Sequence, residues 1–314
     1  MTASEKGLVF RSVLVPLDGS AFGEQALPVA LSIARRAQAA LFIAHVHVPY
    51  AMAYGDSLPP FADSVEDKII EREQSYLSEA TQRLTAASSV PVSSRFVEGA
   101  AVAEAIETAA AVNQADLIVM TTHGHGPLSR LWLGSVADEL IRRASLPVLL
   151  VRPREATADL DQEAVFQHIL VPLDGSPAAE EILEPAATLG RLMQARYTLL
   201  GVTPPLSHGE LDPTSPAMAG RTHSTGQWHA ITEAYLNRVA ARLQDRGLLV
   251  QARVVARQQV APAIIEQAET LGVDLIAMTT HGRRGLPRML LGSVADKVVR
   301  GATTPVLLWR AQAT

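Results

Sequence analysis

Short apolar runs alternate along the chain with longer segments whose apolar residues recur at helical spacing. In the first half, the runs predict five strands: Ser12–Leu17, Leu41–Val48, Val92–Val97, Leu117–Met120 and Val148–Val151. The segments between them predict four helices: Phe22–Ala37, Val65–Ala87, Ala100–Val112 and Ser135–Ala144. Strands that alternate with helices indicate right-handed crossovers and a parallel sheet covered on both faces.

The second half of the chain repeats this order. Its predicted strands are Ile169–Leu173, Tyr197–Thr203, Val250–Ala256, Leu275–Met278 and Val306–Trp309. Its predicted helices are Ala178–Gln194, His229–Arg246, Ala261–Leu271 and Ser293–Arg300. The sequence repeats as well, because VLVPLDGS at Val13–Ser20 returns 156 residues later as ILVPLDGS at Ile169–Ser176. We therefore predict an α/β fold of two tandem, doubly wound domains with five-stranded parallel sheets, over residues 1–152 and 168–314 with a linker over 153–167.

Composition narrows the classes of protein that this chain can be. An apolar content of 48% and a mean hydropathy of +0.14 are typical of a globular protein. No N-terminal basic region precedes an apolar run, and no stretch approaches the roughly 18 apolar residues of a membrane span, so we expect a cytoplasmic protein without a membrane partner. The absence of cysteine excludes disulfides and cysteine-ligated metals. A net charge of −5 and an aromatic content of 4% disfavour nucleic acid as a partner.

One loop motif occurs once in each half. The first copy, MTTHGHGPLSRLWLGSVAD, spans Met120–Asp138, and the second, MTTHGRRGLPRMLLGSVAD, spans Met278–Asp296. In both copies a strand ends at Thr-Thr-His-Gly, and Gly-Ser begins a helix ten positions after that glycine. The unpaired N–H groups and the positive dipole end at a helix N-terminus can receive an anion such as phosphate. The motif therefore predicts an anion site in duplicate.

A simpler interpretation of the same motif is a helix cap. Ser135-x-x-Asp138 and Ser293-x-x-Asp296 match the capping box, in which the serine satisfies the first N–H groups of its own helix. A cap requires no second glycine ten residues earlier, and the loop is more apolar than a solvated turn. We therefore favour the anion site, although duplication alone is compatible with a structural loop that both halves inherited.

The other distinctive residues lie at the ends of predicted strands. Asp18 and Asp174 end the first strand of each half, and Met120 and Met278 end the fourth. Ligands of a doubly wound sheet bind beyond the carboxyl ends of its strands, where the strand order reverses. Apolar residues around a base, an acid for a sugar hydroxyl or ring nitrogen, and N–H groups for phosphates fit a nucleotide. The methionines also suit a core and the Asp-Gly-Ser segments also suit turns, so these simpler roles stay open.

Long loops and histidines accompany these strand ends. The segments Pro49–Ser64 and Pro204–Gln227, rich in Pro, Gly and Ser, predict long loops, which are usually functional or mobile. We expect His123 and His281 to orient the glycine loops. The pairs His45-x-His47 and His123-x-His125 allow an alternative metal site, since alternate strand residues share a face. Threonine and arginine replace the second histidine of each pair in the other half, so we expect no metal.

These residues carry a resemblance to a known family. The chain resembles a tandem universal stress protein of the adenine-nucleotide-binding branch, whose signature is Gly-x-x-Gly, nine residues, then Gly-Ser or Gly-Thr. The copies here read Thr121-Thr-His-Gly124 and Thr279-Thr-His-Gly282, each followed after nine residues by Gly-Ser. Threonine replaces the first signature glycine in both copies. The resemblance covers both halves almost entirely, except the linker and the tips of the long loops.

The resemblance implies a Rossmann-like domain of the adenine nucleotide alpha-hydrolase type that binds ATP, with Mg²⁺, once in each half. The implied adenine contacts are Asp18, Val46 and Met120 in the first half, and Asp174, Val202 and Met278 in the second. The implied phosphate contacts are Gly124, Gly134, Ser135 and Val136 in the first half, and Gly282, Gly292, Ser293 and Val294 in the second. The family pairs its domains through their last strands, which implies an intramolecular pseudo-dimer and allows a homodimer of whole chains.

The expected function is that of a stress-response protein that senses or buffers ATP and changes its interactions with regulatory partner proteins. The chain has no Walker lysine, GxSxG serine, HExxH motif or paired carboxylates on a helix face. We therefore expect a binding protein rather than an enzyme. Two alternatives stay open: a slow Mg-dependent ATPase in which Asp18 or His123 activates water, and a nucleotide-free interaction scaffold.

Overall fold

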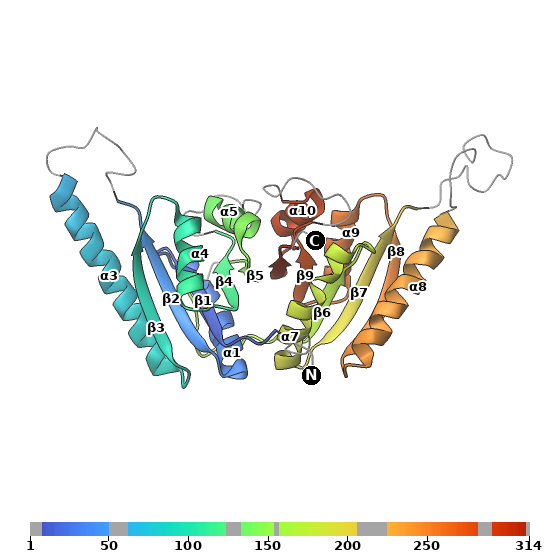
Figure 1. Cartoon of the computed structure of the whole chain (residues 1–314), viewed down its shortest axis with the longest axis horizontal. Helices are drawn as coiled ribbons and strands as arrows, with labels where there is room; N and C mark the ends of the chain where they lie inside the picture. The colour runs from blue at the N-terminus through green and yellow to red at the C-terminus, as the bar shows by residue number, and fades with distance from the viewer. Residues whose placement is uncertain are drawn as a thin grey trace. The chain divides into compact units, whose positions relative to one another are not determined.

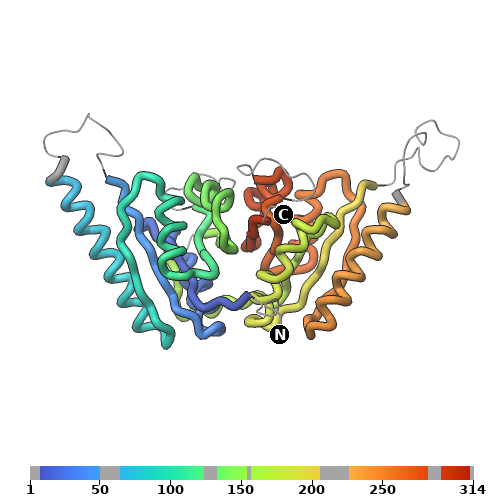
Figure 2. Tube along the Cα trace, viewed as in Figure 1, coloured from blue at the N-terminus to red at the C-terminus, as the bar shows by residue number. Residues whose placement is uncertain are grey.

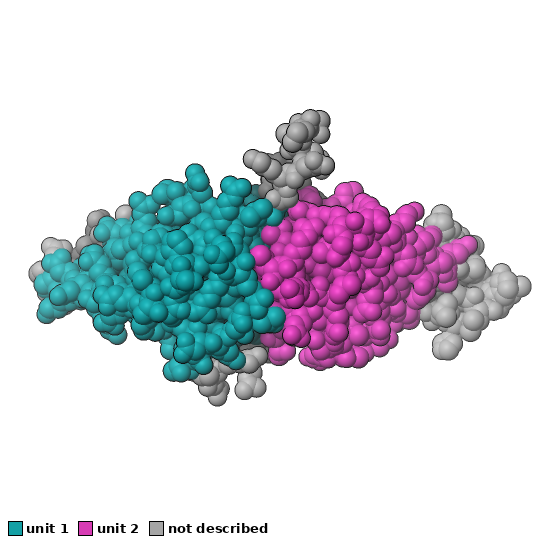
Figure 3. Space-filling model, turned by 90° about the horizontal axis from the view of Figure 1, so that it is seen from below, with its two compact units in different colours: residues 1–165, 308–310 teal, residues 166–307, 311–314 magenta. Residues whose placement is uncertain are grey.

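The computed structural model describes residues 8–49, 62–123, 133–153, 157–205, 225–281 and 291–311. The chain divides into two compact units, which Figure 3 shows in different colours. The first unit comprises residues 1–165 and 308–310, and the second comprises 166–307 and 311–314. Figure 2 follows the trace of each unit in chain order.

The first unit has a parallel sheet in the order β3-β2-β1-β4-β5 (Figure 1). Its strands are β1 (Ser12–Leu17), β2 (Ala40–His47), β3 (Val92–Glu98), β4 (Leu117–Thr121) and β5 (Val148–Val151). Its helices are η1 (Gly23–Gln25), α1 (Ala26–Ala37), α3 (Ala62–Ala87), α4 (Val102–Val112) and α5 (Ser135–Arg143). The predicted fold class is confirmed.

The second unit repeats the first, with strand order β10-β9-β6-β7-β8. Its strands are β6 (His168–Pro172), β7 (Arg196–Thr203), β8 (Leu249–Ala256), β9 (Leu275–Thr279) and the first two residues of β10 (Val306–Trp309), whose last two residues fall in the first unit. Its helices are α6 (Pro177–Glu180), α7 (Leu183–Met193), α8 (Thr225–Gln244), α9 (Val260–Thr270) and α10 (Ser293–Gly301). Each element of the first half therefore has a counterpart, as the internal repeat predicts.

Helices cover both faces of each sheet because the strand order reverses once. In the first unit, α1 joins β1 to β2 and α3 joins β2 to β3, toward one edge of the sheet. The helices α4 and α5 lead to β4 and β5, toward the other edge. Right-handed crossovers place these two pairs on opposite faces. The central strands are consequently buried on both sides, and all five residues of β4 and all four of β5 are buried. Their uninterrupted apolar runs match this position.

Two predicted helices are interrupted in the structure. The segment Phe22–Ala37 forms η1 and then α1, and Ala178–Gln194 forms α6 and then α7. Pro28 and Pro185 lie in the first turn of α1 and α7. A proline lacks an N–H and its ring crowds the carbonyl four residues earlier, so the regular helical hydrogen bonding is interrupted before each proline. The prediction of single helices was wrong for this reason.

The long helices α3 and α8 begin earlier than the sequence pattern predicts. α3 begins at Ala62 and α8 at Thr225, within the segments predicted as loops. Most of both predicted loops lies outside the described residues. None of the helices in the described parts of the chain combines the length and hydrophobicity needed to cross a membrane.

Candidate functional site

The strand order of each sheet reverses at its centre, between β1 and β4 in the first unit and between β6 and β9 in the second. β1 ends at Leu17 and β4 at Thr121, so Asp18 and Thr122 follow neighbouring strands at the same edge of the sheet. Ligands of doubly wound sheets bind at such a reversal. The predicted site residues that follow strands lie at this edge of the sheet.

The Asp-Gly-Ser segments form the same turn in both units. Asp18 Oδ1 accepts hydrogen bonds from the Ser20 N–H at 3.0 Å and from Ser20 Oγ at 2.6 Å. Asp174 Oδ1 accepts the corresponding bonds from Ser176 at 2.9 Å and 2.6 Å. The intervening Gly19 has a φ of +81°, which glycine adopts without strain. The turn role of these aspartates is therefore present, and their contact with adenine stays a prediction.

The end of β4 is held by its two threonines. Thr121 Oγ1 donates to the His123 carbonyl at 2.8 Å, and Thr122 Oγ1 is 2.9 Å from His123 Nδ1. In the second unit, Thr279 and Thr280 make the same two contacts with His281, at 2.7 Å and 3.0 Å. Threonine therefore stands where the family signature has glycine and uses its hydroxyl to fix the loop backbone. Each imidazole is tied to the loop by the threonine before it.

Gly134 and Gly292 allow two backbone segments to touch. The Gly134 N–H donates to the Thr122 carbonyl at 2.8 Å, and the Gly292 N–H donates to the Thr280 carbonyl at 2.9 Å. A Cβ atom would lie 3.1 Å from that carbonyl oxygen at Gly134 and 2.6 Å at Gly292. Both N–H groups are thus already used within the protein. The amides that can receive an anion are those that follow these glycines.

The capping-box interpretation is wrong for both helices. Gly134 and Gly292 are the N-cap residues, and no side chain caps either helix. Ser135 is the first helical residue and is exposed. The Asp138 carboxylate accepts bonds from Arg142 at 3.0 Å and 2.9 Å. The first hydrogen bond of the helix runs from the Asp138 N–H to the Gly134 carbonyl at 2.9 Å, so the amides of residues 135–137 precede the hydrogen-bond ladder of their own helix.

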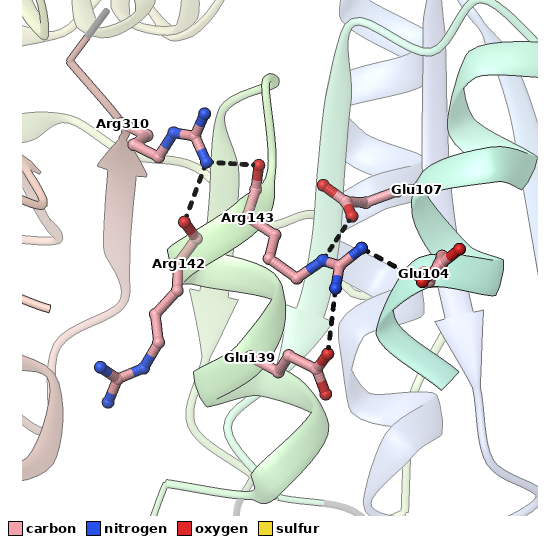
Figure 4. A network of polar contacts seen from close by, with 6 residues as sticks. All are labelled: Glu104, Glu107, Glu139, Arg142, Arg143 and Arg310. Carbon is pink, nitrogen blue, oxygen red and sulfur yellow. Dashed lines mark hydrogen bonds and ion pairs between the residues drawn. The ribbon is translucent and has the colours of Figure 1, made fainter. Parts of the chain in front are cut away.

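A polar network holds the other end of α5 (Figure 4). Arg143 Nε donates to Glu107 at 3.0 Å, and the same guanidinium lies 3.3 Å from Glu104 and 3.6 Å from Glu139. Glu104 and Glu107 belong to α4, so this arginine fastens α5 to α4. Arg310, which belongs to the first unit, donates to the last carbonyls of α5, those of residues 142 and 143, at 3.0 Å and 2.8 Å. The network fixes the position of the helix whose N-terminus faces the site.

The remaining predicted residues lie at the ends of strands or in the first turns of helices. Met120 and Met278 are almost completely buried, with exposed fractions of 7% and 6%. Val46 and Val202 are half-buried, one residue before the ends of β2 and β7. Val136, Ser293 and Val294 occupy the first turns of α5 and α10. Gly124 and Gly282 lie outside the described residues.

A buried polar cluster at the end of β2 was not predicted. His47 Nδ1 is 2.7 Å from Glu73 Oε2, and His47 Nε2 is 3.1 Å from Glu66 Oε1. The two glutamates are seven residues apart, on one face of α3, and this spacing is the signal that could have revealed the cluster. The carboxylates lie at opposite nitrogens of the ring and cannot share one ion with it. Within the described ranges, no group of His, Asp and Glu could hold a metal ion.

Known proteins match both halves of the chain. The model of the Universal stress protein family matches residues 10–152 and 166–310. A universal stress protein of Mycobacterium tuberculosis is 32% identical over 199 residues, which span 63% of this chain and 63% of that relative. A universal stress protein of Thermus aquaticus is 34% identical over 144 residues, which span 46% of this chain and 100% of that protein.

Solved structures share the fold over nearly the whole chain. A universal stress protein from Archaeoglobus fulgidus has a TM-score of 0.68 at 20% identity and covers 97% of this chain and 98% of its own. A putative universal stress protein from Pseudomonas aeruginosa has a TM-score of 0.61 at 17% identity and covers 96% and 94%. The repeated domain, its sheet order and the matched residues lead to one conclusion: the chain belongs to the universal stress protein family and contains two copies of the family's domain.

Proposed function

We propose that this chain binds an adenine nucleotide, ATP with Mg²⁺, in each of its two domains and acts as a nucleotide-dependent sensor or regulator of partner proteins. One observation carries the proposal. In both domains a helix begins at a glycine that has no side chain to cap it, beside the reversal of strand order. An uncapped helix N-terminus offers N–H donors and the positive dipole end to an anion.

The surroundings of these helix ends support an anionic ligand. An arginine offsets the charge of the acidic residue in each first turn, since Asp138 pairs with Arg142 at 2.9 Å and Asp296 pairs with Arg300 at 2.8 Å. Ser135 and Ser293 are exposed, so their hydroxyls are accessible to a ligand. Backbone amides stabilise the charge of a phosphate without activating water. The proposal is therefore one of binding and regulation rather than of rapid hydrolysis.

The identity of the nucleotide requires a direct measurement. One universal stress protein has been solved in complex with cAMP, and it covers 48% of this chain at 21% identity. Mass spectrometry of small molecules released by denaturing the purified chain should detect an adenine nucleotide. Calorimetry with ATP, ADP, AMP and cAMP should then give two sites per chain and rank the ligands. Failure to release or bind any of them at high micromolar concentration would favour the nucleotide-free scaffold.

A charge at the helix start tests the phosphate position. Replacing Gly134 with a larger residue is unsuitable, because a Cβ atom already meets the Thr122 carbonyl at 3.1 Å. Ser135→Asp and Ser293→Asp instead place a carboxylate where it suits the helix dipole but repels phosphate. We expect the double variant to fold normally and to lose roughly tenfold or more in nucleotide affinity, as for like charges a few ångströms apart.

The matched control is the double variant Ser135→Asn and Ser293→Asn, which has the same shape without the charge. It should retain most of the affinity. Equal affinity of the Asp and Asn variants for ATP would place the phosphates elsewhere, and a loss of thermal stability confined to the Asp variant would show that the helix itself had been damaged.

A further inference from the structure

Both nitrogens of the buried His47 ring face carboxylates. The side chain of His47 is only 4% exposed, and its partners Glu73 and Glu66 lie 2.7 Å from Nδ1 and 3.1 Å from Nε2. Carboxylate oxygens accept hydrogen bonds, so both ring nitrogens must donate. Only the protonated imidazolium can do so. The contact between β2 and α3 therefore contains a bound proton.

The other groups around His47 come from β2, β3 and α3. On its own strand, His45 Nδ1 donates to the Leu17 carbonyl at 2.9 Å, and His45 Nε2 lies 3.5 Å from Glu73 Oε2. Phe96 on β3 stacks against both imidazoles, with centroid distances of 5.9 Å and 5.8 Å. Other polar groups in the described part of this neighbourhood are Tyr76 on α3, edge-on to His45, and the exposed Glu98 on β3, in register with His47. The carboxylates of Glu24 and Asp18 act on Tyr76.

The environment of His47 favours its charged form. Burial lowers the pKa of this imidazole, but the hydrogen bonds and charges of Glu66 and Glu73 outweigh burial and raise the pKa above its ordinary value. A raised folded-state pKa means that the contact contributes fully below the ordinary histidine pKa and is lost as the pH rises through the raised value. Above it, the two carboxylates face a neutral ring with a single N–H.

The part of α3 that this cluster holds has few other anchors. In the described part of α3 before Leu77, no side chain is fully buried, and the buried Leu77, Ala80 and Leu84 all lie in its second half. Segments with few buried apolar contacts open most easily. The imidazolium contacts therefore hold a part of α3 whose apolar side chains are at most half-buried.

Among the described residues of the second domain, the corresponding place has no such charged contact. Its strand β7 ends with Gly201-Val202-Thr203 where β2 ends with His45-Val46-His47. Thr232 stands on α8 where Glu73 stands on α3, and its methyl group would lie 2.5 Å from a Cβ atom at Gly201. Close packing, which does not titrate, thus replaces the charged contact.

We propose that a proton on His47 fastens α3 to the sheet in the first domain alone, so that the wall of the first nucleotide crevice loosens as the pH rises. Val46, a predicted adenine contact, lies between the two histidines of the cluster. The consequence for nucleotide rests on the proposed function, whereas the fastening of α3 does not.

Hydrogen exchange of the intact, ligand-free chain tests the fastening. Exchange rates of α3 residues 64–76 and of α8 residues 226–235 are measured at pH 6 and at pH 9. The intrinsic exchange rates of both segments change equally with pH, so α8 serves as the reference for α3. We expect the protection of α3 to fall by roughly tenfold relative to α8, the effect of losing a charged hydrogen bond. A histidine resonance that disappears in the His47→Thr variant should titrate above the ordinary histidine range.

A matched variant gives the first domain the residues that the second domain has at this contact. The triple variant His47→Thr, Glu66→Thr and Glu73→Thr installs the residues that the second copy has at positions 203, 225 and 232. Its α3 should lose the pH dependence and exchange like α8 at every pH, while β4 and β5 stay protected as evidence that the domain is folded. The proposal would be overturned if the exchange of α3 still depended on pH in the triple variant. It would also be overturned if the exchange of α3 and α8 depended equally on pH in the wild type.

A nucleotide titration separates the two proposals. At the first site, affinity should fall between pH 6 and pH 9 more than at the second, and the triple variant should abolish this difference. A chain that binds no nucleotide would refute the proposed function, and the exchange experiment would still decide whether the proton fastens α3.

Discussion

The two long helices α3 and α8 rest on equivalent strands through different chemistry (Figure 1). The first domain buries a charged contact of His47 with Glu66 and Glu73, and the second packs Thr232 directly on Gly201. A charged contact holds only while both partners keep their charge, whereas packing depends on volume alone. One backbone arrangement can therefore be stabilised by either means, and only the first responds to pH.

The largest expected effect comes from adding volume at the packed contact. A Cβ atom at Gly201 would lie 2.5 Å from Thr232 Cγ2 and 3.1 Å from Leu236 Cδ1. Gly201→Val should therefore destabilise the second domain by about 3 kcal/mol, the upper part of the range for overpacked sites. Chemical denaturation, monitored by hydrogen exchange of β6, β7 and β8, measures the loss of stability.

The control for this prediction is Gly99→Ala in the first domain, where the new Cβ would lie 3.4 Å from Ala105 Cβ, an ordinary contact. It should change stability by less than about 0.5 kcal/mol, as for most surface substitutions. A Gly201→Val variant as stable as this control would show that α8 shifts freely and that packing does not hold it.

A smaller effect distinguishes the tyrosines of the two helices. Tyr235 Oη donates to Glu180 Oε1 at 3.0 Å, whereas the buried Tyr76 hydroxyl, although close to Glu24, forms no well-aligned hydrogen bond with the described residues. Tyr235→Phe should cost about 1 kcal/mol, the net value of one hydrogen bond. Tyr76→Phe should be neutral or slightly stabilising, because it removes a buried polar group that is not satisfied.

Unfolding of both tyrosine variants under the same conditions provides the comparison. Glu24 keeps a two-point contact with Arg83, at 3.0 Å and 2.6 Å, with or without the Tyr76 hydroxyl. Equal losses for Tyr76→Phe and Tyr235→Phe would mean that the two hydroxyls are bonded alike in solution.

The smallest expected effect concerns the ends of α1 and α7. Gln38 and Gln194 are C-cap residues in the left-handed region, with φ values of 52° and 54°. Glycine adopts this conformation without strain, so Gln194→Gly should stabilise the second domain by about 0.5 kcal/mol. Gln38→Gly should gain less, because Gln38 Nε2 donates to the Arg35 carbonyl at 2.8 Å. A shift in thermal midpoint measures both, and a loss in both would show that the glycine lowers stability through the unfolded chain.

Apolar periodicity placed two predicted site residues in the correct elements but could not decide between two roles of the loop motif. Asp18 and Ser135 could be placed at a strand end and a helix start because apolar periodicity is local. The capping box, the simpler alternative at Ser135, is not formed because Gly134 is the N-cap, and local spacing does not reveal which residue becomes the N-cap. Nor does it reveal that the Gly134 N–H is used by the Thr122 carbonyl, a contact that depends on where β4 ends relative to α5.

The sequence by itself determined the number of domains and the alternation of strands and helices. These follow from repetition and from the period of apolar residues, which each segment carries independently of its neighbours. The tertiary structure decided the contacts between segments, such as those that join His47 to α3 and Arg310 to the end of α5. Such contacts depend on which elements become neighbours in the fold, and no single stretch of sequence contains that information.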